Sequence, residues 1–147
     1  MTLSPDQDSN PLNILLVDDD DGDARAVQRA FRRKPNTNPI VRAVDGIEAL
    51  EILRGLNGHT KPPEPRILIV DLNMPRMGGI PFVSAIRADK DLRHSIVFIL
   101  TTSKREEDKL AAYDLHVAGF IVKAMAGEDF LNLVNLLESY WRIVDIP

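Results

Sequence analysis

The chain has 147 residues, of which 44% are hydrophobic and 27% charged, and its formal net charge is −4. This length fits one domain, and because the sequence has neither a run of about 18 apolar residues nor a basic, apolar start, we expect no membrane span and no signal peptide. The lack of cysteine excludes disulfides and cysteine-based metal sites, and it is compatible with a cytoplasmic location. Because the sequence has no basic cluster, direct binding of nucleic acid is not expected.

Short apolar runs alternate with amphipathic stretches along most of the chain. Residues 1–11 are polar and contain two prolines, so we expect a flexible leader before a single domain at 12–147. The predicted strands are Asn13–Val17, Ile40–Val44, Arg66–Val70, Ile96–Leu100 and Gly119–Val122. The helices that follow them are predicted at about 21–33, 45–56, 80–88, 104–115 and 126–144, the second one starting at a capping box formed by Asp45 and Glu48. This alternation predicts an α/β fold, a parallel sheet with helices on both faces.

Acidic residues follow the first and third predicted strands. Asp18 and Asp19 come directly after Val17, and Asp71 comes directly after Val70. In a flavodoxin-like (βα)5 doubly wound sheet, with strand order 2-1-3-4-5, these two strands are neighbours, and ligands bind at their carboxyl ends. Three neighbouring carboxylates repel one another unless a cation neutralises them, and Mg²⁺ prefers such oxygen ligands.

The acidic run after the first strand also has an ordinary explanation. Acids are favoured in the first turn of a helix because they interact with its dipole, and a solvated loop tolerates them as well. We prefer this explanation for Asp20, Asp21 and Asp23. For Asp18 and Asp19, which directly follow the strand, we prefer the metal role.

Asp71 is a poor helix cap, because the next helix begins several residues later, after Met74 and Pro75. A carboxylate in this place can act as a nucleophile toward a phosphoryl group. Lys123, at the end of the fifth strand, would supply a positive charge to phosphate oxygens, and Thr101, at the end of the fourth, a hydroxyl. Alone, a lysine is usually solvated and a threonine often reflects β-propensity, so the prediction depends on their joint placement at strand ends.

Four motifs, LLVDDD, IVDLNMPRMGG, LTTS and FIVKA, resemble the receiver domain of two-component response regulators, over the range Ile14–Trp141. The resemblance implies that Asp71 is the phosphoacceptor and that a phosphohistidine of a sensor histidine kinase is the donor. It implies that Asp19 binds Mg²⁺ directly and that Asp18 acts beside it through water. Asn73 would offer its main-chain carbonyl to the metal, with Asp71 as a further ligand.

The same resemblance assigns roles at the fourth and fifth strands. Thr101 would be the hydroxyl that moves toward the phosphate, Phe120 the aromatic ring that swings inward with it, and Lys123 the phosphate-binding lysine. Receivers usually have a proline after this lysine, joined by a cis bond, but here the residue is Ala124. A cis bond before a residue other than proline costs about 3 kcal/mol, so we expect a trans bond with a shifted loop or a strained cis bond.

A finer resemblance concerns the subfamily and the partner. The segment LTTSKREEDKLAAYDLHVAGFIVK, the proline-bearing loop Asn57–Pro65 and ESYW near the end are similar to the single-domain regulators of bacterial and cyanobacterial phytochromes. This resemblance implies a light-regulated histidine kinase, a bacteriophytochrome, as the partner.

The predicted last helix has a wide apolar arc. Its core-facing stripe, spaced at the period of a helix, consists of Phe130, Leu133, Val134, Leu137, Trp141 and Val144. Three more residues widen the arc to about half of the circumference: Leu136, Tyr140 and Ile143. We expect this excess to form a symmetric homodimer through helix four, strand five and helix five, with scattered surface apolar residues as the alternative.

Two other functions compete with a receiver switch. A Mg²⁺-dependent phosphohydrolase or phosphotransferase with Asp71 as nucleophile commonly has a second acid two residues later, where this chain has Asn73, and a substrate cap that is not found here. A receiver that only binds partners would be expected to lack Asp71 or Lys123. The sequence therefore favours a phosphoacceptor switch rather than an enzyme, with at most self-catalysed phosphotransfer and autodephosphorylation.

Overall fold

Five parallel strands form one sheet in the order β2-β1-β3-β4-β5. The computed structural model describes residues 12–32, 39–101, 111–123, 132, 134–137 and 139, so the predicted leader lies outside it. The strands are β1 (Asn13–Val17), β2 (Ile40–Ala43), β3 (Arg66–Asp71), β4 (Ile96–Thr101) and β5 (Gly119–Val122). Order and direction confirm the predicted flavodoxin-like sheet.

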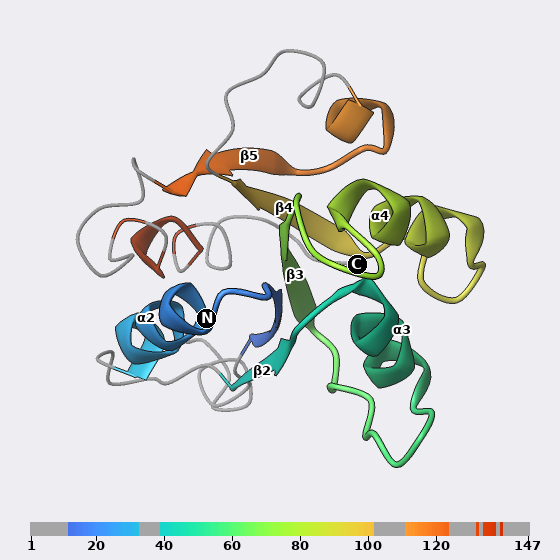
Figure 1. Ribbon diagram of the computed structural model, residues 1–147, viewed down its shortest axis with the longest axis horizontal. Helices are drawn as coiled ribbons and strands as arrows, with labels where there is room; N and C mark the ends of the chain where they lie inside the picture. Colours follow the sequence, from blue (N-terminus) through green and yellow to red (C-terminus); the bar gives the residue numbers. More distant parts are fainter. Residues whose placement is uncertain are drawn as a thin grey trace, which may run out of the picture.

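Helices cover both faces of this sheet. Helix α2 (Asp21–Arg32) lies on one face, and α3 (Gly46–Arg54) and α4 (Gly79–Ala88) lie on the other, as Figure 1 shows. Residues 111–114 are also helical and lie on the α4 side, where Ala112 is fully buried. The doubly wound arrangement is therefore confirmed.

Each central strand contributes side chains to two separate cores. Alternate residues of β1 point to opposite faces, so that Leu15 packs with α3 and α4 while Leu16 packs with α2. Strand β3 alternates in the same way, with Leu68 on the first side and Ile69 on the second. All five residues of β1 are buried, as is typical of a parallel strand covered on both sides.

Helix α3 begins with the predicted capping interaction, although one partner differs from the standard pattern. The Asp45 side chain accepts a hydrogen bond from the Glu48 backbone N–H at 2.9 Å. In return, the Glu48 carboxylate accepts from the N–H of Val44, not from that of Asp45, at 2.9 Å. The helix ends at Gly55, whose left-handed φ of 67° suits a residue without a side chain.

Strands β3 and β4 are each one residue longer than predicted. They end at Asp71 and Thr101, which therefore belong to the sheet instead of following it. Helix α3 is shorter than predicted, and Leu56, beyond its end, is 50% exposed. Tyr113, an apolar position of the fourth predicted helix, is also exposed.

Part of the predicted last helix is described, and it agrees with the expected stripe. Val134 and Leu137 are fully buried, and Leu136, assigned to the wider apolar arc, is exposed. Six positions of the stripe and arc lie outside the described residues: Phe130, Leu133, Tyr140, Trp141, Ile143 and Val144. The Lys123–Ala124 bond lies outside them as well.

Arg87, near the end of α4, donates hydrogen bonds to four main-chain carbonyls. Its Nε donates to Leu115 O at 2.7 Å, and its Nη2 donates to His116 O at 3.0 Å. Its Nη1 donates to Arg93 O at 2.7 Å and to Ser95 O at 2.8 Å. Because these carbonyls precede β4 and β5, the guanidinium connects α4 to both segments that enter the outer strands.

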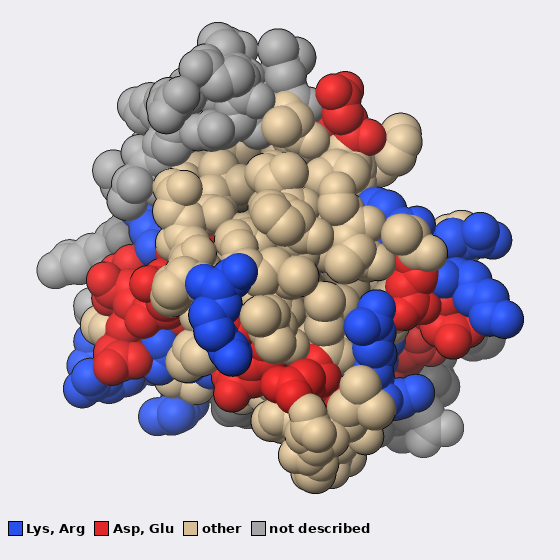
Figure 2. All heavy atoms as spheres, turned by 45° about the vertical axis from the view of Figure 1, so that its right-hand side comes forward, with Lys and Arg blue, Asp and Glu red and all other residues tan. Residues whose placement is uncertain are grey.

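Figure 2 shows the side of the molecule on which α3 and α4 lie. Uncharged side chains cover its middle, and Lys and Arg side chains are interspersed with Asp and Glu around its rim. Among the described residues, no helix is long and apolar enough to cross a membrane.

The tight approach of α4 to the end of β3 requires Gly79. A Cβ at this position would lie 2.5 Å from Asp71 O and 2.9 Å from Leu72 Cα, and main-chain atoms cannot move aside cheaply. We expect Gly79→Ala to lower the free energy of unfolding by about 1–3 kcal/mol, measured by urea denaturation. Ser84→Ala, at an exposed position of the same helix, is the control and should have little effect; equal stability of the two variants would contradict the close approach.

Candidate functional site

Sheet register places the predicted site residues at one edge. Val17 pairs with Val70, so that Asp18 and Asp71 leave adjacent strands at the same level. On the other side, Asp71 pairs with Leu100, one residue before the end of β4. Thr101 pairs with Val122, which places Lys123 one residue beyond that pair. The four strand ends therefore meet, as predicted from the fold.

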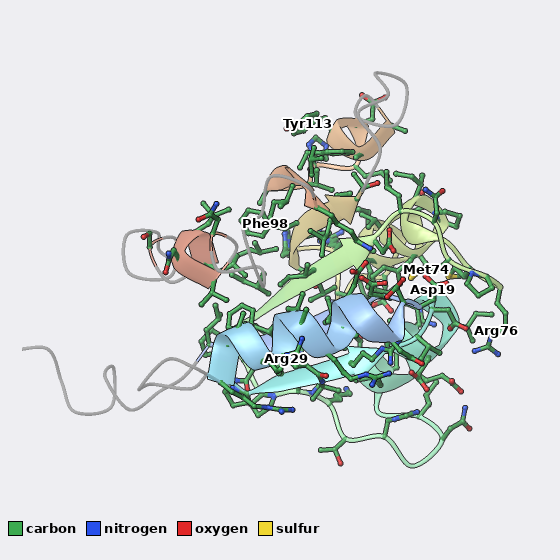
Figure 3. All side chains as sticks on the ribbon, turned by 60° about the vertical axis from the view of Figure 1, so that its left-hand side comes forward. Asp19, Arg29, Met74, Arg76, Phe98 and Tyr113 are labelled. Atoms are coloured by element: carbon green, nitrogen blue, oxygen red, sulfur yellow. The ribbon has the colours of Figure 1, made fainter. Side chains whose placement is uncertain are left out.

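The acidic residues form a compact cluster. One carboxylate oxygen from each of Asp18, Asp19 and Asp71 lies within 4.8 Å of the other two. Asp18 is fully buried, Asp71 is 7% exposed, and Asp19 is open to solvent. Figure 3 shows Asp19, which follows β1, and Met74, which follows β3, at the same end of the molecule, while Arg29 lies on the outer side of α2.

One carboxylate oxygen of Asp18 is buried without a hydrogen bond from the described part of the chain. Its Oδ1 accepts from the Asp20 N–H at 2.9 Å, but its buried Oδ2 has no hydrogen-bond partner among the residues described. The Lys123 ammonium lies 3.2 Å from this oxygen, in a geometry that makes an ion pair without a hydrogen bond. Burial raises the pKa of Asp18 to about 6, against the lowering effects of the Asp20 N–H and Lys123. A hard divalent cation fits this donor set.

Lys123 is the cation that faces these acids. Its Nζ lies 3.3 Å from Asp71 Oδ2, and the lysine side chain is only 11% exposed. Burial by itself lowers the pKa of Lys123, but the Asp23 hydrogen bond and the charges of Asp18 and Asp71 outweigh it and raise the pKa above its usual value. The amine therefore carries its positive charge throughout the neutral range.

Three further predicted residues lie around the cluster. Thr101 is fully buried at the end of β4, and Phe120 is half-buried against the core that α3 and α4 cover. Asn73 is exposed, and its N–H donates a long hydrogen bond of 3.4 Å to Asp71 Oδ1. These positions agree with the predicted site, and the roles implied by the resemblance stay predictions.

Asp23 lies in the first turn of α2, as predicted, but its side chain is only 33% exposed and is not that of a fully solvated acid. Its Oδ2 lies 2.6 Å from Lys123 Nζ, which makes it the nearest carboxylate to the lysine among the residues that the structure describes. The two residues are 100 positions apart in the sequence. Asp20 and Asp21 do lie at an exposed helix start, as expected.

Arg42, which the sequence analysis did not identify, supports the acidic loop from β2. Its Nε and Nη2 donate to the main-chain carbonyl of Asp18 at 3.0 and 2.9 Å. Its Nη1 forms an ion pair with Asp21 at 2.6 Å, which lowers the pKa of that carboxyl. A lone arginine in an edge strand gives no sequence signal for these contacts.

Arg76 fixes the loop that follows Asp71. Its guanidinium donates to both oxygens of Asp45, at 2.6 and 3.1 Å, and this pairing lowers the pKa of the Asp45 carboxyl. Nearby, Gly46 N–H donates to Met77 O at 3.0 Å. The start of α3 and the loop after β3 are therefore connected by side-chain and main-chain hydrogen bonds.

The arrangement suits phosphoryl transfer to a carboxylate. Such transfer depends mainly on positioning and on neutralising the charge of the phosphoryl oxygens. The Asp71 carboxylate lies close to an oxygen of Asp18 and one of Asp19, and the Lys123 ammonium lies 3.2 Å from Asp18 Oδ2 and 3.3 Å from Asp71 Oδ2. A nucleophile, a donor set for a divalent cation and a fixed positive charge thus occur together.

Comparison with known proteins identifies the family. A family model of the response regulator receiver domain matches residues 14–135, which is most of the chain. The chain therefore belongs to the response regulator receiver family, whose members typically act as signalling switches. This finding confirms the family resemblance and does not favour the phosphohydrolase alternative.

The most similar relatives include phytochrome response regulators. Response regulator Rcp1 of Synechocystis sp. is 32% identical over 143 residues, covering 97% of this chain and 97% of that protein. The solved structure of the phosphorylated cyanobacterial phytochrome response regulator RcpA has a TM-score of 0.83 at 30% identity, covering 93% of this chain and 99% of that one. A structure of the Mn²⁺-bound form of Rcp1 has a TM-score of 0.81 at 32% identity, with coverage of 93% and 99%.

These relatives bear on the cation and on the partner class. The acidic pocket matches the kind in which receiver domains bind Mg²⁺ or Mn²⁺, and the Rcp1 structure holds Mn²⁺. Receiver domains of phytochrome response regulators pair with sensor histidine kinases. The chain is homologous to these regulators.

The raised pKa of Asp18 should affect the free energy of unfolding of the metal-free protein. A group whose pKa is higher in the folded than in the unfolded chain destabilises the fold once it ionises. A rise from 3.8 to about 6 corresponds to roughly 3 kcal/mol at most. We expect Asp18→Asn to raise the free energy of unfolding of the metal-free protein by about 1–3 kcal/mol at pH 7.5.

This gain should shrink as the pH falls through 6 and disappear near the unfolded value of about 4, because the wild-type carboxyl is then protonated in both states. Urea denaturation across this range measures it. Excess Mg²⁺ should stabilise the wild type and not the variant, since binding to the folded state alone shifts the equilibrium. A gain that is independent of pH would contradict the buried, ionised Asp18.

Proposed function

We propose that Asp71 accepts a phosphoryl group from the phosphohistidine of a sensor histidine kinase, and that this modification switches a protein-interaction surface. The observation that supports it most directly is the position of the Asp71 carboxylate, which lies beside two further acids and 3.3 Å from Lys123 Nζ. The unit that carries this function is a single receiver domain at 12–147.

Mg²⁺ is the cation that we assign to the site. Its ligands are the carboxylates of Asp19 and Asp71 and the main-chain carbonyl of Asn73, with Asp18 acting beside them through water. The buried Oδ2 of Asp18, which lacks a hydrogen-bond partner among the described residues, supports this donor set. When bound, Mg²⁺ supplies positive charge that neutralises phosphoryl oxygens.

The residues of the chain perform the remaining tasks. Asp71 is the nucleophile, and its location at the end of β3 places the carboxylate at the carboxyl edge of the sheet, where 10% of its side chain is exposed. Lys123 binds phosphate oxygens as a fixed positive charge. Thr101 donates its hydroxyl to the phosphorylated form, and Phe120 moves into the space that Thr101 leaves. The phosphorylated state is then a shift in population between two arrangements.

A light-regulated kinase, a bacteriophytochrome, is the partner that we propose. The homology to phytochrome response regulators supports this class. The donor is thus expected to be a phosphohistidine, and the output a change in protein contacts.

The acceptor assignment is tested by chemical phosphorylation. With Mg²⁺ and acetyl phosphate, the protein should gain the mass of one phosphoryl group, and Asp71→Asn should gain none because the amide is not a nucleophile. Intact-mass spectrometry measures the product. EDTA should suppress labelling of the wild type.

Asp91→Asn is the matched control, since it makes the same chemical change in an exposed loop away from the strand ends. It should label like the wild type. Persistent labelling of Asp71→Asn would assign the phosphate to another residue, and equal labelling in EDTA would contradict the metal role.

We also propose a symmetric homodimer through helix four, strand five and helix five. The exposure of Leu136 on the last helix and of Tyr113 on the fourth predicted helix supports an apolar contact there. Light scattering at tens of micromolar should give the mass of a dimer, and Leu136→Glu should convert it to a monomer. A wild type that is monomeric both with and without phosphorylation would contradict the proposed homodimer.

A further inference from the structure

Within the described part of the chain, the carboxylate nearest to Lys123 is that of Asp23, and not that of the predicted nucleophile or its acidic neighbours. Lys123 Nζ lies 2.6 Å from Asp23 Oδ2, compared with 3.2 Å from Asp18 Oδ2 and 3.3 Å from Asp71 Oδ2. A contact of 2.6 Å is at the short end for a charge-assisted hydrogen bond, whereas 3.3 Å is long. Lys123 is thus held more closely by Asp23 than by Asp71.

The start of α2 fixes Asp23 in this position. Asp20 precedes the helix, and its Oδ1 accepts from the Asp23 N–H at 2.8 Å. The main-chain carbonyl of Asp20 accepts from Ala24 N–H at 2.9 Å, so the first turn is bonded through both groups. The Asp23 side chain is 33% exposed, which leaves it less free than a solvated acid.

Strand alternation explains why α2 meets the lysine. Residues two positions apart in a strand face the same side of the sheet. Asp18, Asp71 and Lys123 stand at or just beyond the ends of their strands, so each is expected on the same side as the residue two positions before it. The residues two positions before them pack on the face covered by α2: Leu16, Ile69 and Ile121. The first turn of α2 therefore points at the side of the site where the ammonium lies.

We propose that Asp23 is a positioning residue, which holds the Lys123 ammonium in the unphosphorylated protein and competes for it with the incoming phosphoryl group. The inference rests on the proposed function of Asp71. It assigns to Asp23 an effect on the rate at which Asp71 is phosphorylated, exerted through Lys123 alone.

Asp23 should slow phosphorylation because its contact with Lys123 is present before the reaction and must weaken during it. The bond from phosphorus to an Asp71 oxygen forms while the bond from phosphorus to the acetate oxygen of acetyl phosphate breaks, and acetate leaves with the electron pair. Lys123 neither gains nor loses a proton, but it must turn its N–H groups toward the phosphoryl oxygens. An interaction that is stronger before the reaction than during it slows the reaction.

Removing the charge of Asp23 should therefore accelerate phosphorylation. We expect Asp23→Asn to raise the second-order rate constant with acetyl phosphate and Mg²⁺ by about three- to tenfold, as a charged hydrogen bond is replaced by a neutral one. Asp23→Glu, which keeps the charge, should return the rate toward that of the wild type.

Asp21→Asn is the matched control. It removes the same charge from the same helix turn, but Asp21 pairs with Arg42 at 2.6 Å. It should change the rate less than twofold, because exposed charges are screened by solvent. Equal acceleration by both variants would show a general charge effect and overturn the proposal.

The dependence on Lys123 is tested in a Lys123→Met background. There, Asp23→Asn should give no acceleration, and acceleration that persisted would overturn the proposal. A second measurement needs neither metal nor phosphate: in urea denaturation of the metal-free protein, Asp23→Asn and Lys123→Met should be non-additive, with the double variant less destabilised than the sum of the single ones. Additivity would refute the contact.

These measurements separate the inference from the function on which it rests. A wild type that is not phosphorylated on Asp71 would contradict the proposed function, while the metal-free unfolding measurements would still test the Asp23–Lys123 contact. Normal phosphorylation with equal rates in the wild type and Asp23→Asn would overturn only the role of Asp23.

Discussion

The site depends on the imbalance between one ammonium group and the carboxylates around it. Lys123 contacts Asp18, Asp23 and Asp71 within 3.3 Å, and Asp19 completes the acidic cluster. One positive charge cannot neutralise four negative ones, and Asp18 is fully buried. The protein therefore holds charge in a place where folding alone would disfavour it, which is typical of functional sites.

The remaining structure serves to hold these groups at fixed positions. Parallel register brings the ends of β1, β3, β4 and β5 to one edge, and two buried cores fix the strands from both sides. Arg42 and Arg76 then fix the two loops that follow β1 and β3 through hydrogen bonds to Asp18 and Asp45. The cores are closely packed and resist deformation. A change of charge at the carboxyl edge of the sheet therefore acts on the loops after β1 and β3, which these hydrogen bonds hold in place.

Much of this site could be predicted from the sequence, because periodicity and strand ends are local properties. Apolar runs gave the strands, and the fold then placed Asp71 beside Asp18. The contact of Asp23 with Lys123 could not be predicted, since it joins residues 100 positions apart through the direction of one helix turn. The pairing of Arg76 with Asp45 could not be predicted either. Arg76 has a φ of 62°, a backbone conformation that a residue other than glycine rarely adopts and that the sequence therefore does not indicate.

Arg87 carries a consequence for the sequences that this fold accepts. Its planar guanidinium reaches four carbonyl oxygens that belong to two separate segments, one before β4 and one before β5. A lysine has three donors on a single atom and cannot span those segments, so replacement of Arg87 by lysine is not conservative here. Among related chains with this connection, natural variation at position 87 should be narrow even though the residue is distant in sequence from every acid of the site.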